Sequence, residues 1–330
     1  MTARERLTWD SASMLAERAL LALGYDTSQA STIARHLLSA EAGGQSALGL
    51  TRVMWIQEIL DAGAPRGDPS VVTHADHAIT VVDGHGGAGY LAAERALARA
   101  RSAALESGVA VAAVRNVFLT GALRSYCDDL ASAGLASVVV SSAAPALLSP
   151  GIGGSRALGT NPIAVGVPGH PFPVIFDSSS SEVSYSEVVA RARRGEPLPD
   201  GAGLDATGQP TRDARSVIEG GALLGWGGHR GFGLATVVQA FAMTLGVPPA
   251  PHSLSDCGML ALVVHPGRWG ATSDGIDVRA LLGVIEEASR SDAPRVPGQH
   301  WAAGQAAARE GGLELDADLV SALRRVASPK

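Results

Sequence analysis

The chain has 330 residues, of which 46% are hydrophobic and 18% charged, a composition typical of a folded globular protein. Its net charge is −6 and it carries no basic block, which argues against nucleic acid or an anionic membrane surface as partner. The only lysine is Lys330, so Schiff-base chemistry and a lysine general base are nearly excluded.

Cysteine usage and the first residues indicate where the protein works. Cys127 and Cys257 stand far apart, which predicts a reducing compartment and no disulfide framework. The opening residues, MTARERLTWD, lack the apolar core of a secretion signal, and no apolar run approaches a membrane span. We therefore expect a cytoplasmic protein. No Cys/His cluster has metal-ligand spacing, so we expect no metal site.

The pattern of apolar residues, caps and breakers predicts alternating helices and strands after a helical start. We expect Asp10 or Ser11 to cap the first helix, and Thr27 or Ser28 to cap the second. The expected helices are Met14–Leu23, a segment around Ile33–Leu38, Arg52–Asp61, Tyr90–Leu105, Tyr126–Leu135, Tyr185–Arg194, Leu234–Leu245, Val278–Ser289 and Asp316–Val326. The expected strands are Ala78–Asp83, Val109–Val114, Ala136–Ser142, Ile163–Val167, Pro173–Phe176 and Gly258–His265.

Residues 84–89 read GHGGAG and match the dinucleotide-binding pattern G-x-G-x-x-G. They follow a predicted strand and precede a predicted helix, in a βαβ-like unit. The next strand, however, ends in Arg115-Asn116 and not in an acid that would hold a ribose. In a chain with 40 glycines we favour a glycine-rich turn over a Rossmann site.

The segment Gly153–Ser181 contains two short apolar runs and ends in four serines behind Asp177. Hydroxyls and free backbone N–H groups at a strand end are one way to hold a phosphate. Ser178, Ser179, Ser180 and Ser181 are therefore a candidate phosphate site, and a solvated serine loop is the alternative.

Five motifs give the chain a resemblance to a known family. They are LGTNP at 158–162, RRGEP at 193–197, LDATGQPT at 204–211, GHRGFGLA at 228–235 and PGQ at 297–299. With them the chain resembles, over nearly its whole length, the malate/L-lactate dehydrogenase type 2 family of NAD(P)H-dependent reductases, which are unrelated to the Rossmann lactate dehydrogenases.

The resemblance implies an α/β fold with an N-terminal helical region and a mixed-sheet cofactor-binding domain. We place the helical region at 1–70, a discontinuous α/β domain at 71–135 and 255–330, and the cofactor-binding domain at 136–254. The C-terminal segments are expected to return to the first part of the chain. Members of this family are usually homodimers, which the resemblance implies here.

The resemblance also implies NADH or NADPH as cofactor. The family's cofactor-contacting positions correspond to Asp177 and Ser178–Ser181, to His229 and Arg230, and to Pro297, Gly298 and Gln299. Arg230 stands where the family usually has lysine, and it keeps a positive charge for a phosphate or carboxylate. Arg52 corresponds to the family's clamp for the substrate carboxylate, with a surface arginine as the alternative. Asn116 and Thr160 are further candidates for substrate contact.

Two departures bear on the chemistry. The family's Gly-x-x-Ser-His-Gly-x-x-Arg reads GQSALGLTR at 44–52, so Leu48 replaces a histidine associated with proton donation. A second histidine, in Asn-Ser-Asn-His-Phe-Gly, is replaced by Leu119. Leucine neither donates nor accepts a proton, and acid–base catalysis typically contributes about 10²- to 10⁴-fold. Ordinary 2-hydroxy acid dehydrogenation should therefore be impaired, in a substrate pocket that Leu48 and Leu119 make apolar.

Three hypotheses follow from these departures. The protein is a reductase of redirected chemistry that acts on a small carboxylate such as a cyclic imine or a conjugated alkene. Alternatively, it catalyses a non-redox cyclisation or elimination, or it is a non-catalytic binding relative. Tyr126 and His229 are the candidate catalytic residues, with a packed tyrosine and a cofactor-positioning histidine as their alternatives. We expect His36 to be a structural histidine.

Overall fold

The structure, a computed structural model, describes residues 3–251, 253–270, 275–289 and 296–328. The helices are α1 (Trp9–Ala22), α2 (Thr27–Ala42), α3 (Arg52–Asp61), α4 (Gly89–Ser107), α5 (Leu123–Ser132), α6 (Tyr185–Arg194), α7 (Ala214–Ile218), α8 (His229–Thr244), α9 (Val278–Ala288), α10 (Gln299–Gly311) and α11 (Ala317–Ala327), with a 3₁₀ turn, η1, at Pro266–Trp269. The strands are β1 (Arg4–Leu7), β2 (Val71–Ala75), β3 (Ile79–Ala88), β4 (Val109–Phe118), β5 (Ala136–Ser141), β6 (Ile163–Val167), β7 (Gly169–His170), β8 (Val174–Ser178), β9 (Gly203–Leu204), β10 (Pro210–Thr211), β11 (Ala222–Leu223), β12 (Cys257–Val264), β13 (Ile276–Asp277) and β14 (Leu313–Asp316).

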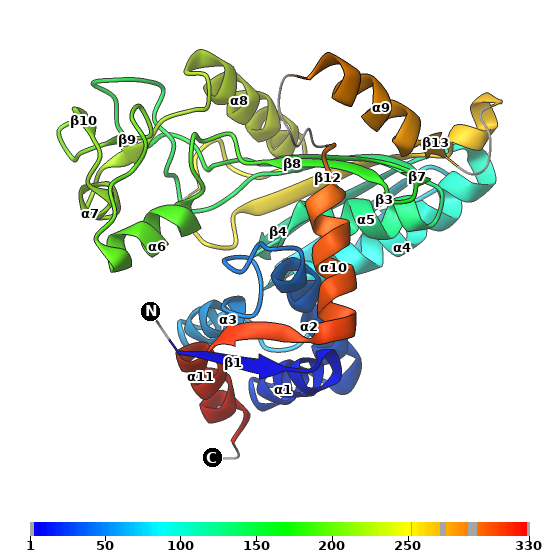
Figure 1. Cartoon of the computed structure of the whole chain (residues 1–330), viewed down its shortest axis with the longest axis horizontal. Helices are drawn as coiled ribbons and strands as arrows, with labels where there is room; N and C mark the ends of the chain where they lie inside the picture. Colours follow the sequence, from blue (N-terminus) through cyan, green and yellow to red (C-terminus); the bar gives the residue numbers. More distant parts are fainter. Residues whose placement is uncertain (1–2, 252, 271–274, 290–295, 329–330) are drawn as a thin grey trace.

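Both ends of the chain build the helical region at the bottom of Figure 1. β1 pairs with β14, and α11 packs against α1 over a shared apolar core, so the C-terminal segments do return to the first part of the chain. The predicted caps are wrong by a few residues. Thr8 caps α1 by accepting from the backbone N–H of Ser11, and Asp26 caps α2 in a capping box with Gln29.

A seven-stranded mixed sheet, in the order β2-β3-β4-β12-β5-β6-β8, forms the centre of the molecule. β3 and β4 are parallel and joined by α4, as the βαβ prediction requires, while every other neighbouring pair is antiparallel. Helices α4 and α5 lie on one side of this sheet, and α8 and α9 on the other (Figure 1). β12 lies between β4 and β5, so one sheet joins strands that the predicted division assigns to two domains.

The predicted glycine-rich turn is wrong, because residues 84–88 belong to β3 and pair with β4 around a bulge. A Cβ on Gly84 would lie 2.2 Å from a methyl carbon of Val117, and one on Gly87 would lie 2.6 Å from Pro69. These glycines therefore allow close packing of two chain segments. Val117 and Pro69 occupy the space beside these two glycines.

The other predicted helices and strands are present, whereas the strands β1, β2, β7, β9, β10, β11, β13 and β14 and the helix α7 were not predicted. α3 and α6 have the predicted bounds, whereas α8 begins at His229, five residues before the predicted Leu234. α10 was not predicted, because its small residues lack an apolar stripe; Gly304 brings it against the backbone of Ala42 at the end of α2. Among the described residues, no helix combines the length and apolarity needed to cross a membrane.

Candidate active site

Arg52 is a buried cation at the first turn of α3. Its residue is 9% exposed, its Nε donates to the carbonyl of Ala47 at 2.9 Å, and its guanidinium lies 4.2 Å from the ring centroid of Trp55. Burial lowers the pKa of Arg52, and no carboxylate of the described residues forms an ion pair with it. A buried positive charge without a counterion is costly, so this position favours an incoming anion.

The turn between α2 and α3 presents Arg52 and carries Leu48. Glu41 of α2 holds this turn by accepting from the backbone N–H of Leu50 at 2.9 Å. A side chain at Gly49 would collide with that carboxylate, because its Cβ would lie 2.2 Å from the Glu41 oxygen. Burial raises the pKa of Glu41. Leu48 is half-buried on the same turn.

Asp177 at the end of β8 links this turn to α5. Its carboxylate accepts from Nε2 of Gln45 at 3.4 Å and from the backbone N–H of Arg124. Burial raises the pKa of Asp177, and the Arg124 charge and these two hydrogen bonds oppose the rise. The Arg124 guanidinium in turn lies 5.6 Å from the ring centroid of Trp301 on α10.

The serine segment after Asp177 is held by hydrogen bonds from its side chains to backbone carbonyls. Ser179 donates to the carbonyl of Thr160, Ser180 to the carbonyl of Asn161 and Ser181 to the carbonyl of Val183. The hydroxyl protons of these three serines are therefore already bonded to carbonyls of the protein. Ser180 is fully buried, and Ser178 donates to the carbonyl of Ser179. A ligand would therefore contact the backbone and the solvent-facing side of this segment.

The three predicted cofactor segments meet around β8. Trp226, just before α8, donates its backbone N–H to the carbonyl of Ser180, and Gly231 on α8 approaches the same carbonyl. On the other side, the carbonyl of Pro297 accepts from Ile175, and Gly298 is the N-cap of α10 with φ of 101°. Gln299 turns its side-chain oxygen back to the backbone N–H of Val296. His229 and Arg230 are exposed on the first turn of α8.

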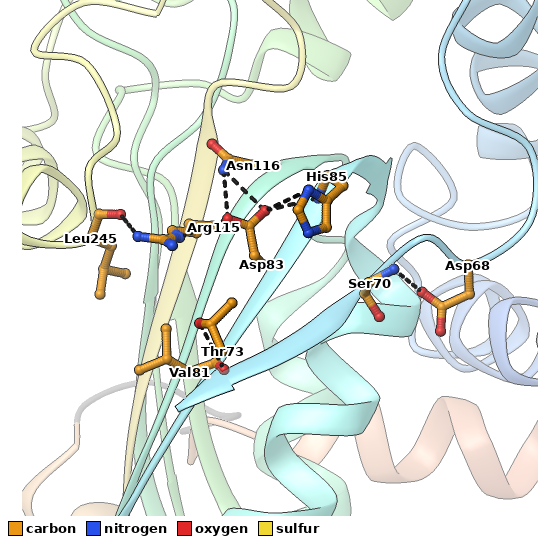
Figure 2. Close-up of polar contacts among 9 residues, drawn as sticks. All are labelled: Asp68, Ser70, Thr73, Val81, Asp83, His85, Arg115, Asn116 and Leu245. Carbon is orange, nitrogen blue, oxygen red and sulfur yellow. Dashed lines mark hydrogen bonds and ion pairs between the residues drawn. The ribbon is translucent and has the colours of Figure 1, made fainter. Parts of the chain in front are cut away.

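Three non-glycine residues of the described part of the chain have positive φ, and two of them, Asn116 (54°) and Leu119 (50°), lie in the segment from Asn116 to Gly121. The Asn116 amide donates to both oxygens of Asp83 at 3.0 Å, beside Arg115 and the third such residue, His85 (Figure 2). Asn116 therefore points to the β3 bulge, and its amide is already bound there. Leu119 packs against the apolar core of the helical region.

A buried aromatic cluster lies behind Gly121. His36 of α2 accepts the backbone N–H of Ala122 at 2.9 Å, and its ring centroid lies 4.7 Å from that of Tyr126 and 5.1 Å from that of Tyr90. Tyr126 donates its hydroxyl to the carbonyl of Thr120 at 2.9 Å, so its proton is committed. These residues border a cavity of about 120 Å³. His36 is structural, as predicted.

Sequence reasoning missed Gln45, Arg124 and Tyr90. Gln45 lies inside the recognised motif at 44–52, but it is a variable position of that motif. Arg124 and Tyr90 lie in helices just after glycine-containing segments. A single polar residue on a helix face that mixes polar and apolar side chains does not indicate a function. Among the described residues, no group of three or more His, Cys, Asp or Glu side chains forms a metal site.

His36 should make folding stability depend on pH. Burial, with a smaller contribution from Arg35, lowers its pKa from 6.5 to about 3, so the folded state favours the neutral ring. This contribution is complete above pH 6.5 and is lost as the pH falls toward 3; by pH 5 the loss is about 2 kcal/mol. Urea unfolding of the wild type and of His36→Asn should show the stability difference shrinking by that amount between pH 7 and pH 5. A pH-independent difference would contradict a buried neutral His36.

Residues 7–324 match the malate/L-lactate dehydrogenase family. The chain is 30% identical to a Delta(1)-pyrroline-2-carboxylate/Delta(1)-piperideine-2-carboxylate reductase of Pseudomonas putida, covering 92% of this chain and 91% of that protein. It is 27% identical to an L-sulfolactate dehydrogenase of Methanothermobacter thermautotrophicus, covering 93% and 92%. The crystal structure of delta1-piperideine-2-carboxylate reductase from Pseudomonas syringae superposes with a TM-score of 0.88 at 25% identity, over 98% of this chain and 99% of that one. The chain therefore belongs to the malate/L-lactate dehydrogenase family.

Proposed function

We propose that this protein is a nicotinamide-dependent reductase of a small cyclic imine or conjugated alkene that carries a carboxylate. The buried, unpaired guanidinium of Arg52 is the observation that carries the proposal. Relatives named as reductases of cyclic imine carboxylates and as a sulfolactate dehydrogenase act on small anions, which supports the same substrate class. A substrate carboxylate would supply the counterion that Arg52 lacks.

The residues around β8 fit a polar cofactor. Three buried polar atoms there have no hydrogen-bond partner among the described residues: Oε1 of Gln45, Nε of Arg124 and Nε1 of Trp226. Gln45 and Arg124 flank Asp177, and Trp226 adjoins Ser180. Unpaired buried donors and acceptors cost free energy, and a bound group of matching polarity removes that cost.

The remaining contacts support the proposal that these segments bind NADH or NADPH. The exposed first turn of α8, with His229 and Arg230, offers a positive helix end and a cation for phosphate. Gly298 at the start of α10 lets the chain pass close to β8. A reduced nicotinamide, when bound, supplies hydride. The protein positions the acceptor: Arg52 orients the carboxylate, and Leu48 and Leu119 present apolar walls.

The apolar walls favour an electrophile that needs little acid catalysis. A protonated cyclic imine already carries the charge that a ketone acquires only in the transition state, so reduction gives a neutral amine directly. An apolar wall also excludes water from the acceptor carbon. These points favour an imine over a 2-keto acid.

Paired arginine variants test the proposal, with binding measured by calorimetry and turnover by nicotinamide absorbance. Arg52→Gln should raise KM for Delta(1)-piperideine-2-carboxylate roughly 10- to 100-fold, because it removes a charge-assisted pair, and should leave dinucleotide affinity unchanged. Arg230→Gln should weaken dinucleotide binding and leave the KM for the imine carboxylate unchanged. Failure of the wild type to bind either NADH or NADPH would contradict the reductase and leave the non-redox or binding alternatives.

We further propose that the protein is a homodimer that pairs through the side of the sheet that α8 and α9 cover only in part (Figure 1). Apolar residues in register cross six strands of this face: Ile79, Val111, Leu262, Val138, Val165 and Phe176. Phe176 is 48% exposed and Leu262 38%. Val237 and Phe241 of α8 are 54% and 47% exposed and add to this apolar surface. This row of uncharged side chains can pack against the same row of a second copy of the chain.

Leu262→Asp should shift the protein to monomer in light scattering, because it places one charge from each copy in an apolar interface. Met14→Asp is the matched control, since Met14 is 58% exposed on α1 and lies outside the sheet. This control should leave the mass unchanged. A dimer that survives Leu262→Asp with unaltered dissociation would place the interface elsewhere.

A further inference from the structure

A polar cavity of about 120 Å³ lies among helices α1, α2, α4, α5 and α10, apart from the candidate active site. Its described lining contains no residue of the substrate clamp, the apolar walls or the cofactor segments. An engineered cavity of about 150 Å³ holds benzene, so this one has room for roughly four waters or for an organic molecule of about five non-hydrogen atoms. The side chains that line the cavity decide which molecule it favours.

Two buried residues that line this cavity have hydroxyl groups without a hydrogen-bond partner. Ser125 on α5 is 3% exposed and Tyr90 on α4 is 1% exposed, and neither hydroxyl bonds to any described residue. Tyr126, which also lines the cavity, differs because its hydroxyl donates to the carbonyl of Thr120. An unpaired buried hydroxyl is unfavourable, and each hydroxyl can both donate and accept. Ser125 and Tyr90 therefore favour a ligand with a hydrogen-bonding group of its own.

The face of α5 that carries Ser125 also brings two carboxylates to the cavity. Asp128 and Asp129 follow Ser125 at the spacing that makes side chains neighbours on a helix. Asp128 is half-buried and accepts from the neutral indole N–H of Trp301 at 3.1 Å, and burial raises its pKa. Asp129 is exposed. Among the described residues, no cation forms an ion pair with either carboxylate.

Two cations that line the cavity are engaged with other groups. Arg35 on α2 forms an ion pair with Glu94 on α4 at 3.1 Å. The guanidinium of Arg309 on α10 lies 4.6 Å from the ring centroid of Trp9, and its charge opposes the rise in the pKa of Asp128 without forming an ion pair. The cavity therefore combines carboxylates that lack an ion-pair partner with two unpaired hydroxyls, which suits a small cation with several donors.

We propose that this cavity binds a small primary ammonium ion that carries a hydroxyl group. The ammonium N–H groups donate to the Asp128 carboxylate, and the ligand hydroxyl pairs with the hydroxyls of Ser125 and Tyr90. His36, which also lines the cavity, is neutral at pH 7 and adds no opposing charge. The inference does not depend on the proposed reductase function, because the clamp and the cofactor segments lie outside the cavity lining.

Ethanolamine, a primary ammonium ion with one hydroxyl, is the probe, and NMR of the Trp301 indole N–H is the readout. This N–H donates to Asp128, so its chemical shift reports on the cavity itself. The signal is assigned by substituting each tryptophan in turn. Titration of ethanolamine at neutral pH and constant ionic strength should shift it in a saturable way. The absence of a shift would show that water alone fills the cavity and would overturn the proposal.

Two molecules of the same size separate the contributions of charge and hydroxyl. Ethylene glycol lacks the charge of ethanolamine, and n-propylamine lacks its hydroxyl. Ethanolamine should bind roughly 10- to 100-fold more tightly than ethylene glycol, the value of a charge-assisted hydrogen bond, and about three- to tenfold more tightly than n-propylamine, the value of a neutral one. Equal affinities for ethanolamine and ethylene glycol would contradict a cation site, and equal affinities for the two amines would contradict the role of the hydroxyls.

Variants of the lining residues test which groups hold the probe. Asp128→Asn keeps an oxygen for Trp301 and removes the charge, so it should lose the preference for ethanolamine over ethylene glycol. Ser125→Ala combined with Tyr90→Phe should lose the preference over n-propylamine, and removal of unpaired hydroxyls should not destabilise the fold. Glu58→Gln, which removes an exposed carboxylate of α3, is the matched control and should bind like the wild type. Preferences that survive in the cavity variants would place the amine elsewhere and overturn the proposal.

Discussion

A positive charge buried without a negative partner is the constraint around which the candidate site is arranged. Arg52 is fixed at the start of α3 by one hydrogen bond to Ala47 and by the face of Trp55. Neither contact neutralises the charge. A buried charge of this kind is costly, and an anion that binds in the site would offset the cost. The reductase proposal depends on this inference.

The strand β8 brings the rest of the site to that charge. Asp177 lies at the end of β8. It accepts a hydrogen bond from Gln45 in the turn before Arg52 and another from Arg124 of α5. After Asp177, Ser180 contacts the loop before α8. Before Asp177, Ile175 contacts Pro297 ahead of α10. Three segments that are far apart in sequence thus meet at a single strand. Phe176, adjacent to Asp177, faces the opposite side of the sheet, so β8 also connects the site to the proposed dimer face.

The sequence predicted this fold well where local signals were strong. α6 has the predicted bounds, which the Ser184 cap and the Gly195 C-cap set in the structure, and continuous apolar runs predicted β5, β6 and β12. It failed where tertiary packing decides. The bulge at Gly84 follows from contacts with Val117 and Pro69, residues that no local pattern connects. The bonding of the serine hydroxyls could not be predicted from sequence, because acceptors such as the carbonyl of Thr160 lie on a different segment.

The family motifs predicted more of the candidate site than residue spacing did, but they did not show which side chains have a free hydrogen-bonding group. The motifs located Arg52, Asp177 and the α8 turn, yet Tyr126 was chosen as donor because it follows a motif. Only the structure shows that its hydroxyl is occupied and that the hydroxyl of Tyr90 is not. Hydrogen-bond satisfaction depends on every neighbour in three dimensions, so it cannot be read from residue type alone.

The central claim is that Arg52 receives the substrate carboxylate, and a crystal structure of the complex with picolinate tests it most directly. The account predicts both carboxylate oxygens on the Arg52 guanidinium. A carboxylate bound instead to Arg124 or Arg230, with Arg52 still unpaired, would contradict it.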